Sequence, residues 1–376
     1  MSGLRVLHIV STLKAYGAER QVLELIPSLA RSGIEARALA VYDSNLSEQD
    51  ERALGTAVAS VGRRGRRDYG FMPKLVRTIA SFRPDVVHTH THVGKYWGRP
   101  AARLAGAKAI VHTEHNPCDP RRNPAERLLD RAYGRFTSRF VLFFPEQRDF
   151  LARMESIAPE KIVAIPNGLD SAPFDRRSRR EEIRRAHSIP DDRLAIMMVG
   201  RLEHQKNHEL ALRAVARLNP ALRDRIALYV VGAGAREREL RSASQELGIG
   251  ASTHFLGYRS DAGELLGAAD VLLNASHFEG MPITFVEAML AGVPIVTTPW
   301  LGAANMLDEG ALGFIAAGWQ PQDLARTLER ALGDDGARAC CTALAGARAR
   351  SDYTVSRTAG SHVRLYETLA ARGVPA

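Results

Sequence analysis

The stretch from residue 270 to residue 298 constrains the fold of this chain more than any other. The apolar runs at its two ends, Asp270–Ala275 and Pro294–Thr298, have the composition of buried strands. Between them the sequence predicts one short helix. Pro282 suits its first position, where a missing N–H has no cost, and Gly292 suits the left-handed residue just after its end. The stretch therefore predicts strand, loop, helix and strand in succession.

The start of this helix is suited to an anion. Glu279 lies in the loop before it, and Glu287 lies about one turn into it. The first backbone N–H groups point out of the helix start and the helix dipole adds partial positive charge, so a phosphate is favoured there. These groups belong to Gly280, Met281, Ile283 and Thr284. Two carboxylates beside a phosphate site fit a sugar nucleotide, which has hydroxyl groups on both sides of its diphosphate.

A pair of cations follows another predicted strand. Arg201 and Lys206 come after the apolar run 194–199 and before a predicted helix. At the carboxyl end of a strand such a pair suits a diphosphate, because arginine offers a forked donor and lysine a mobile point charge. Each charged residue also has a simpler explanation as a surface charge, and for either Glu279 or Glu287 alone that explanation is the more common one.

Elsewhere apolar runs alternate with helices of period 3.6. Leu4–Val10 predicts a strand, followed by a loop that ends at Gly17 and by an amphipathic helix. This is the opening unit of a doubly wound α/β sheet. The same order begins again at residue 194. Between the two parts, Pro166-Asn167-Gly168 predicts a turn with a residue able to take positive φ, as a hinge requires, although an ordinary turn explains it equally well.

The segment EGMPITFVEAMLAGVPIV closely resembles the donor-binding signature of the family 4 retaining glycosyltransferases, which have the GT-B fold. Further segments resemble blocks of that family in the same order and cover nearly the whole chain. They are AYGAERQ (15–21), HTEH (112–115), IPNGLD (165–170), VGRLEHQKNH (199–208) and FLGYRSD (255–261).

The resemblance implies an α/β fold with two Rossmann-like domains that face each other across a cleft. Residues 1–168 would form the acceptor-binding domain, joined by a C-terminal helix at 354–376 that returns to it. Residues 169–353 would bind the nucleotide sugar.

The resemblance also implies roles for particular residues. Arg201 and Lys206 would stabilise the leaving diphosphate, Glu279 would position the sugar and Glu287 would hold the ribose. His115, the last residue of HTEH, would lie beside the transferred sugar. The catalytic set is therefore His115, Arg201, Lys206 and Glu279. The donor-binding set adds Gly17, Gly200, Tyr258, Arg259, Gly280, Met281, Pro282, Ile283, Thr284 and Glu287. Glu114 is given no catalytic role.

The resemblance leads us to expect a retaining transferase that uses a UDP-sugar, the commonest donor in the family, or, next, GDP-mannose. The acceptor would be a glycan, a lipid-linked molecule or a small molecule in the synthesis of cell-surface polysaccharide or glycoconjugate. The two cations would offset the charge of the leaving group, so we expect no metal and no cofactor. The alternatives are a non-catalytic partner or regulator that binds nucleotide sugars, or a phosphorylase or epimerase of the same fold, of which the phosphorylase would require pyridoxal.

Histidines and cysteines give no clear metal pattern. His88, His90 and His92 alternate near the end of a predicted strand and could face one side as ligands. Neutral packing is the better explanation, because no carboxylate or cysteine completes a set. Cys118, Cys340 and Cys341 form neither a metal spacing nor an even set for disulfides, which fits a reducing compartment.

Charge and hydropathy bear on partners and location. No apolar run is long enough to span a bilayer and the first 14 residues make an unconvincing signal peptide, so we expect a cytoplasmic protein. The net charge is +9. Arginine clusters at 63–64, 66–67 and 121–122 are candidates for peripheral contact with an anionic membrane at its inner face or with an acidic acceptor. Nucleic acid is not expected, because no recognition motif accompanies the charge.

Overall fold

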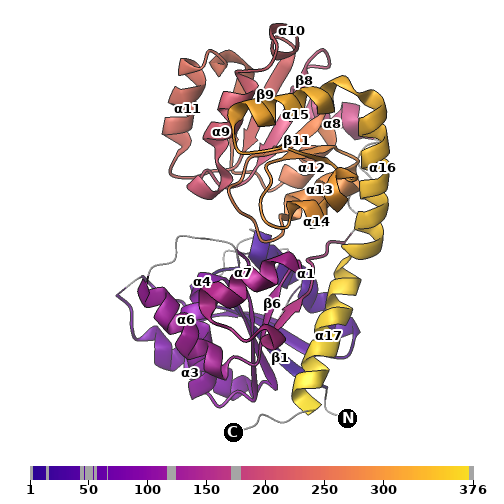
Figure 1. Ribbon diagram of the computed structural model, residues 1–376. Helices are drawn as coiled ribbons and strands as arrows, with labels where there is room; N and C mark the ends of the chain where they lie inside the picture. Colours follow the sequence, from indigo (N-terminus) through magenta and orange to yellow (C-terminus); the bar gives the residue numbers. More distant parts are fainter. Residues whose placement is uncertain are drawn as a thin grey trace. The chain divides into compact units, whose positions relative to one another are not determined.

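The computed structural model describes residues 3–13, 17–42, 46, 54, 57–65, 67–116, 124–170 and 179–371. The chain forms two compact units (Figure 1). The first unit comprises Met1–Leu169 and Thr354–Ala376, and the second comprises Asp170–Tyr353. The sequence-based boundaries were 1–168 with 354–376, and 169–353. None of the described helices combines the length and apolar character needed to cross a bilayer.

The first unit is built on a seven-stranded sheet with the order β3-β2-β1-β4-β5-β6-β7, in which all neighbouring strands are parallel. The chain reverses its direction of winding between β1 and β4, as in a doubly wound sheet. The strands are β1 Arg5–Val10, β2 Glu35–Ala40, β3 Val58–Ser60, β4 Val86–His90, β5 Ala109–Thr113, β6 Arg139–Leu142 and β7 Ile162–Ala164. The sequence indicated β1, β2, β4, β5 and β6, but not β3 and β7, which have only three residues each.

Helices flank this sheet. They are α1 Gly17–Arg31, α3 Phe71–Phe82, α4 Thr91–Val93, the π-helical segment η2 Gly94–Gly98, α5 Arg99–Leu104, α6 Pro124–Phe136, α7 Glu146–Glu155, the 3-10 turn η3 Pro159–Lys161, and α17 Val355–Ala371. α17 packs on α1, and its Ala359 and Tyr366 belong to the same core as Val6 and Val22 (Figure 1). The C-terminal helix therefore belongs to the first unit, as the sequence predicted.

Gly168 differs from the prediction of a turn with positive φ. Neither Asn167 nor Gly168 has positive φ, and neither residue lies in a turn. The reason for glycine is instead close approach. A Cβ at position 168 would lie 2.2 Å from the carbonyl oxygen of Thr354, and the Gly168 N–H donates to Gln21 Oε1 at 3.2 Å. This glycine lets the end of the first segment lie against the beginning of the returning helix.

The second unit has a six-stranded sheet with the order β10-β9-β8-β11-β12-β13, again with parallel neighbours. Its strands are β8 Leu194–Val199, β9 Ile226–Val231, β10 Thr253–Gly257, β11 Val271–Asn274, β12 Ile295–Thr297 and β13 Phe314–Ile315. Its helices are α8 Arg180–Ala186, α9 His208–Val215, α10 Pro220–Arg223, α11 Glu237–Glu246, α12 Ala262–Leu265, α13 Ile283–Ala291, α14 Ala303–Met306, α15 Pro321–Gly333 and α16 Asp335–Asp352. The 3-10 turns are η6 His204–Lys206, η7 Gly250–Ser252, η8 Leu266–Ala268 and η9 Asp308–Gly310.

α13 is the helix that the opening stretch of sequence predicts. Gly292 ends it in the left-handed conformation with φ 66°, which confirms the prediction for this glycine. The sequence predicted that Pro282 would be the first helical residue. It is instead the residue before the helix, with φ −69° and ψ 118°. The Pro282 carbonyl accepts from the Phe285 N–H at 3.0 Å, so proline begins the first turn without belonging to the helix.

Candidate functional site

Lys206 and Glu279 meet at the carboxyl edge of the second sheet. β8 and β11 are parallel neighbours, so the loops that follow them lie at the same edge. The His277 N–H donates to the Gln205 carbonyl at 2.9 Å and joins the two loops. Lys206 Nζ donates to Glu279 Oε1 at 2.6 Å. Two residues that are 73 positions apart in sequence thus form one ion pair.

Glu279 is held by several further donors. Ser276 Oγ donates to Oε1 at 2.6 Å, Gln205 Nε2 lies 3.4 Å from Oε2, and Asn274 Nδ2 lies 3.4 Å from Oε1. The glutamate is only 5% exposed, so it is not the solvated loop charge of the simpler explanation. The carboxylate has a fixed orientation before any ligand binds. Sequence reasoning missed Ser276, Gln205 and Asn274, although all three lie close in sequence to a predicted residue.

Gly200 makes room for the Lys206 side chain. Its φ is 156°, and a Cβ there would lie 3.1 Å from Lys206 Cε. After β9, Gly232 and Gly234 pack against the same loop, since their Cβ atoms would lie 1.9 Å from the Gly200 carbonyl oxygen and 2.5 Å from the Leu202 carbonyl oxygen. The GxG pattern at 232–234 is therefore explained by backbone packing beside the lysine.

α13 supplies the remaining features of the predicted phosphate site. Its first residues, Ile283 and Thr284, have backbone N–H groups with no carbonyl partner within the helix, as at any helix start. Gly280 and Met281 are buried in the loop that precedes it. Glu287 is 3% exposed, so it does not occupy a solvated helix face. A buried carboxylate on this short helix is consistent with a binding role.

The other predicted donor residues of this unit are more exposed. The Arg201 side chain is 54% exposed and pairs with Glu203 at 2.9 Å, so the structure does not bring it into the Lys206–Glu279 contact. Tyr258 is 53% exposed, and Arg259 pairs with Asp261 at 2.6 Å. A ligand would have to draw Arg201 away from Glu203.

In the first unit, His115 lies two residues after β5 and borders a small cavity. Its Nε2 lies 3.2 Å from His90 Nδ1, and burial lowers the pKa of His115 to about 4. Gln21, Thr113 and Asn167 also line this cavity. Gly17 is exposed at the start of α1, and a Cβ there would meet no other described atom within 4 Å. Residues 14–16 of the glycine loop lie outside the described residues.

His88, His90 and His92 do not face one side as a set of metal ligands, the arrangement that the sequence analysis set aside in favour of neutral packing. His92 lies on α4 with its side chain 70% exposed, and it contacts Glu126 at 3.4 Å. His88 and His90 instead join His8 of β1 in the sheet, with ligand atoms within 4.8 Å of one another. The sequence pointed to no such cluster, because β1 is far away in the chain.

The ring nitrogens of this cluster, except His8 Nε2, already have hydrogen-bond partners. His88 bonds Tyr366 at 2.6 Å and Thr113 at 2.7 Å, and His8 bonds His90 at 3.0 Å. Burial lowers the pKa of His88 and of His90 well below the usual value. The histidines therefore pack as neutral hydrogen-bonded groups, and a bound ion would have to replace some of these bonds.

Glu114 belongs to a buried ion-pair network. It accepts from Lys95 Nζ at 2.7 Å, and the same ammonium lies 3.3 Å from Asp130. Arg99, which is fully buried, donates to Asp130 at 3.2 Å. The network ties η2 and α5 to α6 and to the end of β5, a structural role that agrees with the absence of a catalytic assignment for Glu114.

The predicted arginine clusters and the cysteines can be compared with the structure only in part. Arg63 is 6% exposed and packs over the rings of Phe71 and Trp97 at 4.3 and 5.1 Å, so it is not part of a basic surface patch. Arg64 and Arg67 are exposed. Among the residues named above, Arg66, Cys118, Arg121 and Arg122 lie outside the described part of the chain. Cys340 and Cys341 are free thiols.

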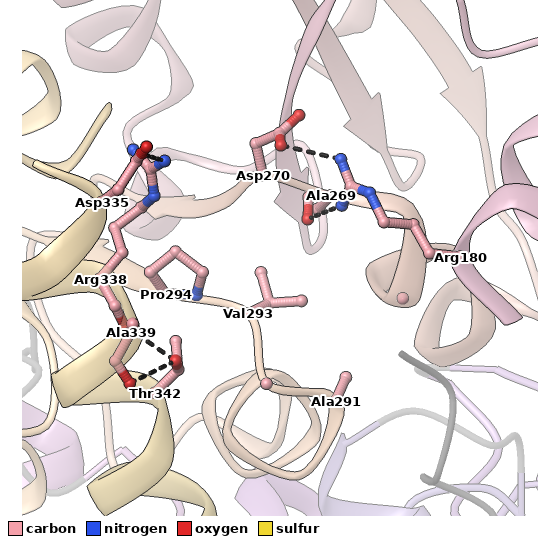
Figure 2. A pocket seen from close by; sticks show the side chains of 12 residues that line it. Arg180, Ala269, Asp270, Ala291, Val293, Pro294, Asp335, Arg338, Ala339 and Thr342 are labelled. Carbon is pink, nitrogen blue, oxygen red and sulfur yellow. Dashed lines mark hydrogen bonds and ion pairs between the residues drawn. The ribbon is translucent and has the colours of Figure 1, made fainter. Parts of the chain in front are cut away.

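A cavity of about 320 Å³ lies at the opposite edge of the second sheet (Figure 2). It is bordered by Asp270 and Pro294, which precede β11 and β12. Arg180 donates to Asp270 at 2.8 Å and to the Ala269 carbonyl at 2.7 Å across one side of it. No predicted site residue lines this cavity, and its arginines are used in structural contacts.

Comparison with known proteins identifies the family of this chain. The family described as "Glycosyl transferases group 1" matches residues 179–345, and "Glycosyltransferase Family 4" matches residues 15–172. The chain belongs to the family 4-like glycosyltransferases. The Lys206–Glu279 pair and α13 lie within the first of these matches, and Gly17 and His115 lie within the second.

Among the relatives is a D-inositol 3-phosphate glycosyltransferase of Thermobifida fusca, 29% identical over 266 residues, which make up 65% of this chain and 61% of the relative. Another, from Escherichia coli, is UDP-Gal:alpha-D-GlcNAc-diphosphoundecaprenol alpha-1,3-galactosyltransferase, 27% identical over 258 residues and 66% of each chain. The matched parts thus amount to less than two thirds of the length of these relatives.

The Anabaena protein HepE, whose crystal structure contains UDP and glucose, matches the fold of this glycosyltransferase family member with a TM-score of 0.83. It is 20% identical, and the match covers 97% of this chain and 100% of HepE. The predicted fold class, an α/β protein of the GT-B type with two parallel-sheet domains, is confirmed.

Proposed function

We propose that this protein is a retaining glycosyltransferase that moves a sugar from a nucleoside diphosphate to a hydroxyl acceptor. The observation that carries the proposal is the ion pair between Lys206 and the buried Glu279, beside the start of α13. A UDP-sugar is the first candidate donor and GDP-mannose the second. Relatives named for UDP-Gal, and a fold neighbour solved with UDP, support this order.

In the proposed reaction an acceptor hydroxyl attacks the anomeric carbon while the bond from that carbon to the diphosphate breaks. The nucleoside diphosphate leaves with additional negative charge, and its phosphate oxygen takes the proton of the acceptor. Lys206 and the first N–H groups of α13 would stabilise this charge, with Arg201 if it leaves Glu203. We propose no metal, because Lys206, Arg201 and the start of α13 would supply the positive charge beside the diphosphate, and we propose no protein nucleophile.

Glu279 and Glu287 would bind the two ends of the donor. Glu279 accepts from Lys206, Ser276, Gln205 and Asn274, and these bonds fix the direction of its carboxylate, which suits selection of sugar hydroxyls. Glu287 would accept from the ribose hydroxyls, and main-chain groups at Tyr258 and Arg259 would contact the base. His115 and Gly17 of the first unit would contribute from the acceptor-binding domain.

The acceptor is proposed by class only: a glycan, a lipid-linked molecule or a small molecule. Relatives named for a diphosphoundecaprenol substrate and for lipopolysaccharide support a role in cell-surface glycoconjugate synthesis. We further propose a cytoplasmic protein that contacts the anionic inner face of the membrane. α6 supports this, since it exposes Leu128 (68%) and Leu129 (40%) next to the exposed Arg127 and Arg131.

The proposal is tested with a panel of nucleotide sugars in a thermal-shift assay on the full chain. A donor that binds only the folded protein raises Tm by an amount that grows with its affinity. The expected result is a rise for one UDP-sugar, or for GDP-mannose, and slow release of its nucleotide without acceptor. Binding without any nucleotide release would favour a non-catalytic binding protein. No rise with any member of the panel would contradict the proposed function.

A further inference from the structure

Three histidines of the first unit form a continuous chain of ring-to-ring hydrogen bonds. His8 lies on β1, His90 ends β4 and His115 follows β5. His8 Nδ1 lies 3.0 Å from His90 Nε2, and His90 Nδ1 lies 3.2 Å from His115 Nε2. His90 therefore uses both ring nitrogens, and it connects the fully buried His8 to the residue assigned to the transferred sugar.

Such a chain fixes the position of every proton in it. A neutral imidazole has one N–H donor and one acceptor nitrogen, and each bond of the chain needs one of each. Burial favours the neutral form, since it lowers the pKa of His8 to about 3 and of His115 to about 4. The tautomer of one ring therefore determines the tautomers of the other two.

His8, at the inner end of the histidine chain, indicates which ring donates and which accepts in each hydrogen bond. His8 Nε2 is buried and has no hydrogen-bond partner among the described residues. A buried N–H without an acceptor is a rarer defect than an unsatisfied acceptor, so the proton of His8 is better placed on Nδ1. His8 then donates to His90, His90 donates from Nδ1 to His115, and His115 accepts at Nε2. The remaining proton of His115 must lie on Nδ1.

We propose that His90 and His8 are positioning residues that hold His115 in its Nδ1–H tautomer. The inference rests on the proposed function, in which His115 contacts the sugar. The nitrogen of His115 outside the chain is then a donor, and its ligand is an acceptor oxygen such as a sugar hydroxyl. The cavity that His90 and His115 border together with Gln21 and Thr113 leaves space beside this end of the chain.

His88 offers a matched control. It is as buried as His90 and lies two residues before it on β4, but its nitrogens bond Tyr366 and Thr113 instead of the chain. Loss of the His88 ring should therefore disturb packing to a similar degree without releasing the tautomer of His115.

The experiment is a long-range ¹H–¹⁵N correlation spectrum of the full chain labelled with ¹⁵N-histidine, which distinguishes protonated from unprotonated ring nitrogens. His115→Asn identifies the His115 signals. We expect Nδ1–H alone in the wild type, a mixture of tautomers in His90→Phe, and the wild-type pattern in His88→Phe. His90→Asn places an amide donor where Nδ1 was and should restore the Nδ1–H form.

A wild-type His115 that is not in the Nδ1–H form overturns the inference, and this result requires no variant to fold. So does an unchanged pattern in His90→Phe, or an equal change in His88→Phe. The spectrum is independent of catalysis. An active transferase in which His115 has the other tautomer would refute this inference and leave the proposed function standing. A protein with the expected tautomer that neither binds nor transfers any sugar would refute the proposed function.

Discussion

The position of the Lys206 side chain depends on a single residue, Gly200, which leaves room for it. A methyl group at position 200 would meet the Lys206 side chain at 3.1 Å, and φ of 156° disfavours any side chain. Gly200→Ala should therefore destabilise the protein by about 1–3 kcal/mol and move Lys206 out of the ion pair. We expect a lower Tm and at least tenfold weaker nucleotide binding, measured by calorimetry.

Gly17→Ala is the matched control for this prediction. A Cβ at position 17 meets no described atom, so Tm should change little. If Gly17 is needed for approach to the donor diphosphate, turnover should nevertheless fall. A large loss of Tm in Gly17→Ala, or normal nucleotide binding in Gly200→Ala, would contradict these assignments.

Ser276 is a neutral donor to Glu279, with Oγ 2.6 Å from the carboxylate. Hydrogen bonds to charged groups contribute about 1.5–3 kcal/mol, so Ser276→Ala should lower turnover by roughly tenfold or more through misorientation of Glu279. Steady-state kinetics with the donor found in the thermal-shift panel measures this. Ser242→Ala, which removes an exposed serine on α11, is the control. Equal turnover in both variants would show that Ser276 does not orient the carboxylate.

The sequence indicated Lys206 and Glu279 because charged residues follow apolar runs at strand ends. It did not indicate Ser276, Gln205 or Asn274, since polar residues in loops are common and their partners are set by the pairing of β8 with β11. Gly168 was interpreted wrongly for a similar reason. Its need for glycine comes from Thr354, and a contact across 186 positions leaves no local pattern.

The exposed surface of helix α6 allows the proposed membrane contact to be tested. Its only buried residue is Asp130, while Leu128 and Leu129 are exposed among arginines. The double variant Leu128→Asp with Leu129→Asp should reduce co-sedimentation with vesicles that contain anionic phosphatidylglycerol. The wild type should bind these vesicles better than purely zwitterionic ones, and salt should weaken the binding.

Leu344→Asp provides the control for α6, because Leu344 is an exposed leucine (48%) on α16 of the second unit. It should leave vesicle binding unchanged. Equal sedimentation of the wild type and the α6 variant would remove α6 from any membrane contact.

Apolar runs identify β1, expected at Leu4–Val10, and β8, expected at 194–199, to within a residue. Local irregularities do not follow from such runs. The helical stretch from Thr91 to Leu104 contains the π-helical segment η2, whose Lys95 reaches the buried carboxylates of other elements. These partners lie on α6 and just after β5. The sequence of the helix alone therefore cannot indicate that this turn is π-helical, with one residue more than an α-helical turn.

Buried histidines make the stability of the whole molecule sensitive to acid. Burial lowers the folded-state pKa of His8 and His112 to about 3 and of His208 and His362 to about 4, below the unfolded value of 6.5. The unfolded chain thus binds more protons below pH 6.5. Stability should be complete above pH 6.5 and should fall as pH decreases, by up to about 1.4 kcal/mol per pH unit for each histidine.

Thermal unfolding between pH 7.5 and 5 measures this dependence. His362→Asn should make the decline of Tm less steep, because it removes one histidine from the fully buried group. His92→Asn, at an exposed position, should leave the slope as it is. A Tm that is constant from pH 7.5 to 5 would contradict the prediction that these rings are neutral in the folded protein.

The GT-B fold type and the two parallel sheets were predictable from the order of strands, helices and motifs along the chain. The histidine cluster of the first unit was not, because it joins His8 to His88 and His90 through the pairing of β1 with β4 and not through sequence proximity. Fold class depends on patterns that are local and repeated, whereas the site depends on which strand ends become neighbours.

The central claim is that Lys206 and Glu279 together bind and activate a nucleotide-sugar donor. The most direct measurement is the rate of glycosyl transfer by Lys206→Ala and Glu279→Ala, with Lys108→Ala, an exposed surface lysine, as the control. We predict that each site variant stays folded by circular dichroism and loses at least about 100-fold in kcat/KM, or roughly 2.7 kcal/mol, while the control keeps its activity. Near-normal transfer by either folded site variant would contradict the account.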